Sequence, residues 1–430
     1  MLLRDLTRLG AALLFGNIVG VATVGFLSII LFAWSVWKIP IATDFVPWSE
    51  ASYSPVLAAF MFGGALLAGW IFSHLEGPRS HGPADTIVAI KNDTDIELKG
   101  GWLTSALTLV SVSCGASVGL FGPIVHFGAC IGSLLQRAFR LLSRSLLLAA
   151  GGAAAIAALF SAPIAASIFA HEMLLRRFRS SESAPLVVAA LGGFFASVML
   201  LGSDRKLLKI VGEPLDVSPE SLALAVVLGL LCGLASTLYI YLLTRGPKLA
   251  NATKIPSLFR PLVPATILYL VSPFFPQLIG PGLGAVNMAL AGQFGLVLLL
   301  LLVFLKIFAA ALCRSFGFHG GIFLPAVFFG AMLGGMIDAA LGGGHHMYAL
   351  LGAAACAGSA IGAPIAAVVI IFEMSGDYRF IVLAMVAVAV SCQVSRTLIG
   401  RSVWDRSLFL RGIDTDDEPR PPSAGDRRPG

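Results

Sequence analysis

The chain has 430 residues, of which 57% are hydrophobic and only 12% are charged, whereas soluble domains carry about 25% charged residues. This composition excludes a soluble globular protein and indicates an all-α polytopic membrane protein. The formal net charge of +6 does not indicate nucleic-acid binding, because the Lys and Arg residues stand in short clusters beside apolar segments.

Seven apolar segments are long enough to cross a hydrocarbon layer of about 30 Å. In chain order they are residues 11–37, 55–74, 146–170, 184–202, 220–244, 284–313 and 379–400. Their uninterrupted apolar runs favour helices over the alternating strands of an outer-membrane barrel. Basic clusters beside membrane spans mark cytoplasmic loops, and Arg4 and Arg8 precede the first segment. We therefore expect the amino terminus on the cytoplasmic side.

Two segments of the sequence each occur twice in similar form. GLFGPIVHFGACIG at 119–132 returns as GIFLPAVFFGAMLG at 321–334, with eight of fourteen positions identical at a shift of 202. SAPIAASIFAHEM at 161–173 returns as GAPIAAVVIIFEM at 362–374, with seven of thirteen positions identical at a shift of 201. Two independent matches at nearly the same offset indicate a duplicated chain.

The repeat halves are about 50–200 and 250–400 within a transmembrane domain at 1–411. Duplicated membrane halves commonly pack as inverted repeats, and an odd number of crossings per half would produce that inversion. The polar, Pro-rich residues 412–430 predict a disordered cytoplasmic tail. About twenty residues after the last apolar segment leave no room for a regulatory domain, so we expect no CBS domain.

The first duplicated motif predicts a helix that begins inside the membrane. The apolar runs after Pro123 and Pro325 are too short to cross and indicate half-helices, each with the proline at its first position. The first N–H groups of a helix have no partner within it and carry the positive end of the helix dipole. Two such ends meeting at the repeat interface would bind an anion. Packing of small residues explains either copy alone, but both copies together favour the anion site.

These motifs make the chain resemble the CLC chloride channels and chloride/proton exchangers over residues 10–410. The family's Gly-Ser-Gly-Ile-Pro appears as RSHGP at 79–83, and its Gly-Arg/Lys-Glu-Gly-Pro appears as GLFGP at 119–123. Its Gly-x-Phe-x-Pro appears as GIFLP at 321–325, and SVWDRSL at 402–408 stands where the family has a tyrosine. The resemblance implies a CLC-type inverted repeat of tilted and half-spanning helices, assembled as a homodimer with one pore per subunit.

The resemblance also implies two anion positions. The central anion would accept hydrogen bonds from the Ser80 hydroxyl and from the backbone N–H groups of Ile322 and Phe323. The outer anion would lie against N–H groups of four further residues: Leu120, Phe121, Gly122 and Leu324. Ser80 resembles the residue of chloride-preferring members, and the asparagine-rich signature of the fluoride exporters is not seen. Chloride and similar monovalent anions are therefore the expected cargo.

Three departures from the family pattern bear on mechanism. The external gating glutamate falls on Phe121, which cannot titrate but could gate by dewetting, and the sequence leaves open whether its ring stands aside or blocks the path. The internal proton-transfer glutamate falls on Met173, while Glu172 matches its carboxylate neighbour, and an alignment shift of one residue would change that assignment. Trp404 replaces the central-site tyrosine; its indole N–H can donate a hydrogen bond but cannot accept one.

These losses predict a passive, proton-uncoupled chloride channel or uniporter. Two alternatives remain: an anion/proton antiporter that uses another residue, such as Glu172 or a histidine, and a family member that binds an anion without conducting. We expect the lipid bilayer of the bacterial inner membrane as the location, with both termini cytoplasmic. No cofactor, metal or nucleic acid is expected, and no phosphate-loop, HExxH or GxSxG motif suggests an enzyme.

Several polar residues stand in apolar surroundings. Glu172 and Glu373 occupy equivalent repeat positions, which favours a shared structural role such as hydrogen bonding to backbone over a functional one. Lys306 should face protein or water rather than lipid. His126 is expected to be a hydrogen-bonded core histidine rather than a proton sensor. His345 and His346 should lie in a loop, with a metal site there only a weak suggestion. His81 and His171 could titrate near neutral pH. All six cysteines should pack in the core.

Overall fold

The structure is a computed structural model and describes residues 2–37, 55–75, 81–203, 205–210, 216–342, 347–400 and 402–413. Within these ranges the chain forms helices and no strand, apart from one isolated antiparallel bridge. Seven of the described helices are long and apolar enough to cross a membrane. The all-α polytopic architecture expected from the composition is therefore confirmed.

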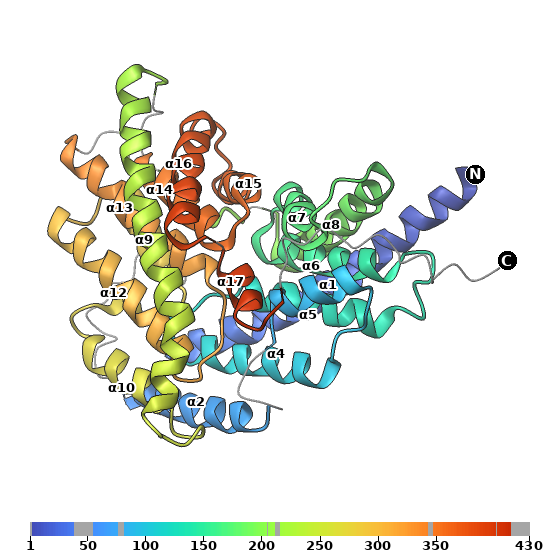
Figure 1. Cartoon of the computed structure of the whole chain (residues 1–430), viewed down its shortest axis with the longest axis horizontal. Coiled ribbons are helices and arrows are strands. Elements are labelled where there is room, and N and C mark those ends of the chain that lie inside the picture. Colours follow the sequence, from blue (N-terminus) through green and yellow to red (C-terminus); the bar gives the residue numbers. More distant parts are fainter. Residues whose placement is uncertain are drawn as a thin grey trace.

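The described residues of the first half form eight α-helices and a π-helical turn. They are α1 (Leu2–Trp37), α2 (Pro55–Ser73), α3 (Pro83–Asn92), α4 (Leu98–Ser113), α5 (Phe121–Leu135), α6 (Arg144–Phe160), α7 (Pro163–Phe169), the π-helical turn η2 (Ala170–Leu175) and α8 (Ser180–Leu201). In Figure 1 the helices α1 and α5 to α8 gather on the right side of the molecule.

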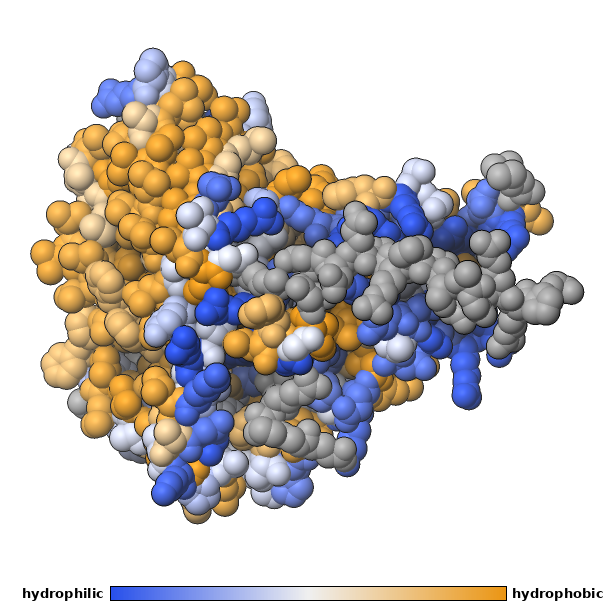
Figure 2. Space-filling model, in the orientation of Figure 1, coloured by the Kyte–Doolittle hydropathy of each residue, from blue (hydrophilic) through white to orange (hydrophobic). Residues whose placement is uncertain are grey.

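The second half lies mostly on the left of Figure 1, and α17 lies between the two groups. Its elements are α9 (Pro219–Ala252), α10 (Leu262–Val271), the short 3-10 turn η3 (Pro276–Leu278), α11 (Leu283–Leu290), α12 (Leu296–Ser315), α13 (Phe323–Ala340), α14 (Tyr348–Ile361), α15 (Pro364–Ser375), α16 (Ile381–Ile399) and α17 (Val403–Phe409). Figure 2 shows apolar surface over the α9 and α12 side and polar residues nearer the centre and lower right.

Equivalent helices of the two halves make equivalent contacts. A methyl group added to Gly128 of α5 would lie 2.2 Å from the carbonyl oxygen of Gly151 in α6. The counterpart in the second half is a methyl group on Gly330 of α13, which would lie 2.1 Å from the carbonyl oxygen of Gly352 in α14. Such distances leave no room for a side chain, so the backbones of both pairs pack directly on each other.

Where the halves meet, the equivalent helices α7 and α15 run antiparallel. The carboxylate of Glu172, just after α7, accepts hydrogen bonds from two N–H groups at the start of α15, at 3.1 and 2.8 Å. Glu373 near the end of α15 accepts from the two corresponding N–H groups of α7, at 3.1 and 2.7 Å. This reciprocal capping confirms the expected structural role of both carboxylates and the inversion of the repeat.

Two of the seven predicted spans are wrong as single helices. The 146–170 segment breaks between α6 and α7, where Ser161 has a left-handed φ of 55° and Pro163 begins the next helix. The 284–313 segment divides into α11 and α12 around Gly292, whose φ is 67°. Hydropathy alone missed both breaks because the turn residues are small and stand among apolar ones.

Other polar and sulfur-bearing groups fit the expectations. Lys306 is fully buried, donates to the carbonyl oxygen of Gly280 at 2.7 Å, and lies 4.9 Å from the ring centre of Phe328, so it faces protein. All six cysteines are free thiols; five are buried and Cys392 is partly buried.

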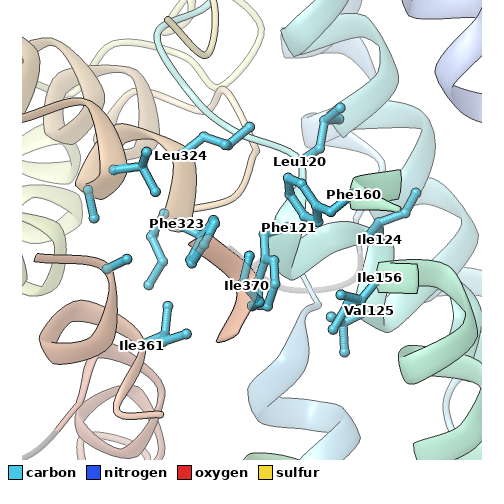
Figure 3. Packing of buried hydrophobic residues seen from close by; sticks show 14 of the residues in the cluster. Leu120, Phe121, Ile124, Val125, Ile156, Phe160, Phe323, Leu324, Ile361 and Ile370 are labelled. Carbon is cyan, nitrogen blue, oxygen red and sulfur yellow. The ribbon is translucent and has the colours of Figure 1, made fainter. Parts of the chain in front are cut away.

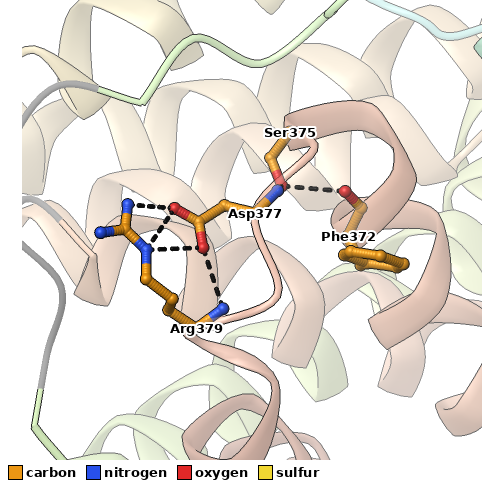
Figure 4. Close-up of polar contacts among 4 residues, drawn as sticks. All are labelled: Phe372, Ser375, Asp377 and Arg379. Carbon is orange, nitrogen blue, oxygen red and sulfur yellow. Dashed lines mark hydrogen bonds and ion pairs between the residues drawn. The ribbon is translucent and has the colours of Figure 1, made fainter.

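The turn between α15 and α16 shows a different kind of polar contact, an ion pair. Asp377, whose side chain is mostly buried, and the exposed Arg379 form it (Figure 4), and the hydrogen bonds from Arg379 lower the pKa of the Asp377 carboxyl below its usual value. Ser375, whose hydroxyl donates to the carbonyl oxygen of Phe372, accepts from the Asp377 N–H and closes the turn.

Candidate functional site

The two copies of the first repeated motif touch at their leading glycines. Gly119 donates its N–H to the carbonyl oxygen of Gly321 at 2.8 Å, and Gly321 returns the bond at 2.6 Å. A methyl group on Gly321 would lie 2.7 Å from the backbone nitrogen of Phe121. The bridge therefore holds the beginnings of α5 and α13 close together at the repeat interface, and only glycine fits there.

Both helices begin two residues earlier than predicted. Pro123 and Pro325 are the third residues of α5 and α13, rather than the first. The next N–H in each helix bonds back to the capping residue, from Ile124 to the Leu120 carbonyl at 3.0 Å in α5 and in the same way in α13 at 3.2 Å. Because proline has no N–H, each helix has two N–H groups with no acceptor inside the helix.

These four N–H groups belong to buried residues. They come from Phe121 and Gly122 in α5 and from Phe323 and Leu324 in α13. Across the described part of the chain, no backbone carbonyl accepts from any of them. Buried N–H groups without an acceptor are costly, and those at helix N-termini carry partial positive charge. The arrangement therefore suits an anion.

Two further elements converge on the same place. A methyl group on Gly122 would lie 3.3 Å from the Pro83 ring at the start of α3, and 3.8 Å from Cζ2 of Trp404 on α17. A cavity of about 60 Å³ opens beside these residues, lined also by Ile322, and it has room for an anion with some water. Ser80, the expected hydroxyl donor, lies outside the described residues, as do His345 and His346.

Phe121 does not stand in open space. Its side chain is 0% exposed and stacks on Phe323, with ring centres 4.6 Å apart and planes at 25° (Figure 3). Phe169 packs edge-on against it at 4.9 Å, and Phe160 lies at 5.8 Å. Phe121 therefore lies at the centre of an apolar aromatic cluster that contains residues from both halves.

Met173 and Trp404, the other two residues expected to depart from the resemblance, are also in apolar surroundings. Met173 lies in η2 and is 2% exposed. Glu172 beside it is engaged with the start of α15. Trp404 is buried, and its ring packs edge-on against Phe169 at 5.9 Å, so it joins the cavity to the aromatic cluster.

The histidines near the motifs have defined partners. The Nδ1 atom of His126 lies 2.8 Å from the hydroxyl of Thr86, which agrees with the expected core histidine, but its buried Nε2 atom has no partner. The Nε2 atom of His81 lies 3.3 Å from a carboxylate oxygen of Glu97. His171 is buried and bonds through Nδ1 to a backbone carbonyl at 2.9 Å.

Sequence reasoning missed two residues of this region, Arg314 and His319, which line the cavity. A signal was present in the repeat. At the shift of 202, their first-half counterparts are Val112 and Ser117, so the second copy carries a basic and a titratable side chain where the first carries an apolar and a small one.

The sequence is similar to known membrane proteins along most of its length. It matches the family described as voltage gated chloride channel over residues 64–396. It is 27% identical over 371 residues to the voltage-gated ClC-type chloride channel ClcB of Escherichia coli O17:K52:H18 (strain UMN026 / ExPEC), covering 84% of this chain and 88% of the relative. The ClcB of E. coli strain K12 / DH10B gives the same identity and coverage.

Solved structures share the fold. A slow cyanobacterial Cl⁻/H⁺ antiporter superimposes with a TM-score of 0.80 at 21% identity, covering 96% of this chain and 99% of the other. A CLC-type fluoride/proton antiporter has a TM-score of 0.76 at 24% identity, covering 93% and 97% of the two chains. A eukaryotic CLC transporter has a TM-score of 0.72 at 20% identity, covering 95% and 75%.

Proposed function

The chain belongs to the CLC family of voltage-gated chloride channels, a family of channels and transporters, and we propose that it carries chloride and similar monovalent anions passively, without proton coupling. The observation that carries the proposal is the pair of helix N-termini held together by Gly119 and Gly321, with four buried N–H groups that have no backbone acceptor among the described residues. A dehydrated anion between the helix ends satisfies these donors.

The anion path has two positions in this proposal. The central anion contacts the Ser80 hydroxyl, the N–H groups of Ile322 and Phe323, and the indole N–H of Trp404. The outer anion lies against N–H groups of residues near the start of the two helices: Leu120, Phe121, Gly122 and Leu324. The convergence of α3, α5, α13 and α17 on one cavity supports this assignment.

The absence of coupling follows from two positions. A coupled exchanger needs a carboxylate that alternates between proton and anion, and a relay that supplies the proton. Phe121 and Met173 occupy the family's two glutamate positions, and neither side chain titrates. Glu172 is the nearest carboxylate to Met173 in the sequence, but its two oxygens already accept hydrogen bonds from the start of α15.

The ring of Phe121 is the gate in this proposal. Stacked on Phe323 and fully buried, it closes the outer end of the path by excluding water. Anion flux then requires the ring to leave the aromatic cluster.

We also propose the placement of the chain. The transmembrane domain, residues 1–411, lies in the bacterial inner membrane, and both termini are cytoplasmic. Arg176 pairs with Asp405 and Arg411 pairs with Asp85, so a basic loop and the end of α17 share one face. Basic clusters favour the cytoplasmic side. In this proposal the chain works as a homodimer.

The experiment is chloride efflux from liposomes that contain the purified protein, with internal pH recorded at the same time and a proton ionophore added midway. Passive flux predicts efflux that runs down the chloride gradient, collapses at the chloride Nernst potential and moves no protons. Protein-free liposomes provide the control.

Two other outcomes contradict the proposal in different ways. Uphill proton movement driven by chloride means that another group carries protons, and the chain is then an antiporter, as two of the structural relatives are described. Chloride binding with neither chloride nor proton flux means a non-conducting member of the family. Unchanged anion binding in a Ser80→Ala variant contradicts the assignment of the central position.

A further inference from the structure

The cavity beside Trp404 has basic walls that the proposed path does not use. Its lining includes Arg314 at the end of α12 and His319 in the loop before α13. Arg314 donates through Nη1 to the carbonyl oxygen of Gly320 at 2.7 Å and lies 3.2 Å from Nδ1 of His319. The cavity thus continues from the central position toward a guanidinium and an imidazole.

Arg314 provides positive charge that no carboxylate of the described residues neutralises. In the described ranges, no carboxylate lies within ion-pair distance of it. Arg411, the other arginine of the cavity, pairs with Asp85 at 2.8 Å, so these two contribute little net charge. On α9, the Tyr239 hydroxyl bonds to the carbonyl oxygen of Ile322 at 3.4 Å and is uncharged at neutral pH.

His319 is the histidine whose protonation changes the charge of the cavity. His81 also lines it, but its Nε2 atom lies 3.3 Å from a carboxylate oxygen of Glu97, so that ring already has an acidic partner. His126 stacks on His81 with ring centres 6.1 Å apart and bonds to Thr86, behind the cavity wall. His319 is 5% exposed and has no acidic neighbour of this kind.

The contact between Arg314 and His319 determines which ring nitrogen of His319 carries the proton. Arginine can only donate, so Nδ1 of His319 must accept, and the ring is neutral with its proton on Nε2. A second proton on Nδ1 breaks this bond and places two cations side by side. An anion in the cavity removes that repulsion, and the Arg314 N–H that is released can bond to it.

We propose that Arg314 and His319 form a proton-linked anion site in the inner mouth of the path, where chloride binding and protonation of His319 favour each other. The choice of chloride as the anion rests on the proposed function. By linkage, acidification strengthens anion binding, and anion binding draws a proton onto the site with the same coupling energy.

The first test measures protons directly. Potassium chloride is added to the purified full-length protein in weakly buffered detergent solution near pH 6.5, and the pH of the solution is recorded. Wild-type protein takes up a fraction of a proton per chain, and potassium gluconate, whose anion is too large for the cavity, gives no uptake. Absence of uptake while chloride binds, as measured by calorimetry, overturns the proposal.

Variants of Arg314 and His319 distinguish the effect of the fixed charge on chloride binding from the effect of proton binding. His319→Gln keeps a side-chain acceptor for Arg314 but cannot titrate, so proton uptake should fall at least about fivefold. Arg314→Gln should weaken chloride binding at every pH, and Arg314→Lys, which restores the charge, should recover most of the affinity. His74→Gln removes an exposed histidine at the end of α2 and serves as the matched control with wild-type uptake.

Chloride affinity across pH gives the second readout. The wild-type dissociation constant should rise about fivefold or more from pH 5.5 to pH 8, whereas His319→Gln should stay nearly constant. An equal pH dependence in both proteins overturns the proposal. Proton uptake without chloride flux in liposomes would contradict the proposed function but not this site. Chloride flux together with unchanged proton uptake in His319→Gln would contradict this site but not the proposed function.

Discussion

Phe121 is the single residue on which the proposed gate depends. Its ring is fully buried against Phe323, and truncation to alanine opens a space between the halves at the start of α5. We expect Phe121→Ala to increase chloride efflux from liposomes at least about tenfold, which corresponds to about 1.4 kcal/mol off the barrier. The increase should carry no proton flux, since alanine also cannot titrate.

The matched control for this variant is Phe329→Ala. Phe329 is equally buried on α13, but its ring packs against Tyr239, away from the aromatic cluster. Both variants should lose about 3–5 kcal/mol of stability, while only Phe121→Ala should gain flux. Equal flux in Phe121→Ala and wild type would show that the ring does not obstruct the path.

Ser161 and Gly362 are equivalent residues that end equivalent helices. Both are left-handed, with φ of 55° and 76°, but only glycine adopts this conformation without strain. We expect Ser161→Gly to stabilise the protein by about 0.5–1 kcal/mol, measured as thermal unfolding in detergent. Gly362→Ser should destabilise it by more than that, because the new Cβ would lie 2.5 Å from Cβ of Ser402. A lower unfolding temperature for Ser161→Gly would contradict the argument.

At the scale of elements, α7 and α15 stabilise each other through their carboxylate caps. Each of Glu172 and Glu373 accepts two N–H bonds from the partner helix. We expect Glu172→Gln and Glu373→Gln each to lower stability by about 1 kcal/mol, since the amide retains one acceptor but loses the charge beside the helix dipole. Thermal unfolding of both variants measures this.

The same pair distinguishes a cap from a proton carrier. A structural role predicts equal destabilisation by the two substitutions and wild-type anion flux below the unfolding temperature. A change in proton movement for Glu172→Gln alone, with unfolding unchanged, would assign Glu172 to transport instead.

At the scale of the whole molecule, the face formed by α7 and α15 favours a second copy of the chain. Glu172 and Glu373 are only partly buried there, and the neighbouring Ile164 and Ile365 are 56% and 57% exposed. Partly exposed carboxylates facing lipid are costly, and covering them with protein removes that cost.

We therefore expect the protein in detergent to have twice the mass of its 44.9 kDa chain, measured by light scattering corrected for detergent. Ile365→Trp should shift the protein toward the monomer. The control Val297→Trp changes a residue that is 72% exposed on α12 and should leave the mass unchanged. A monomeric wild type would contradict the dimer.

Much of this architecture could be predicted from the sequence, because duplication and hydropathy both act over long stretches. The paired motifs located the starts of α5 and α13 to within two residues, and the shared position of Glu172 and Glu373 predicted a shared structural role. The break at Ser161 was missed because one serine between Phe160 and Ala162 hardly changes local hydropathy. The contact of Arg314 with His319 was missed because both residues lie just before the duplicated segment at 321–334, and their counterparts Val112 and Ser117 differ in type.

The hydrogen bonds from the start of α15 to Glu172 also determine how long this carboxylate waits for its donors during biosynthesis. The donor nearer the helix start lies 193 residues after the carboxylate, so a ribosome adding about 5–20 residues per second needs roughly 10–40 s to deliver it. During that interval the newly inserted first half has an unpaired carboxylate and an unpaired glycine edge in the membrane. Two separately translated halves should therefore assemble when they are made together.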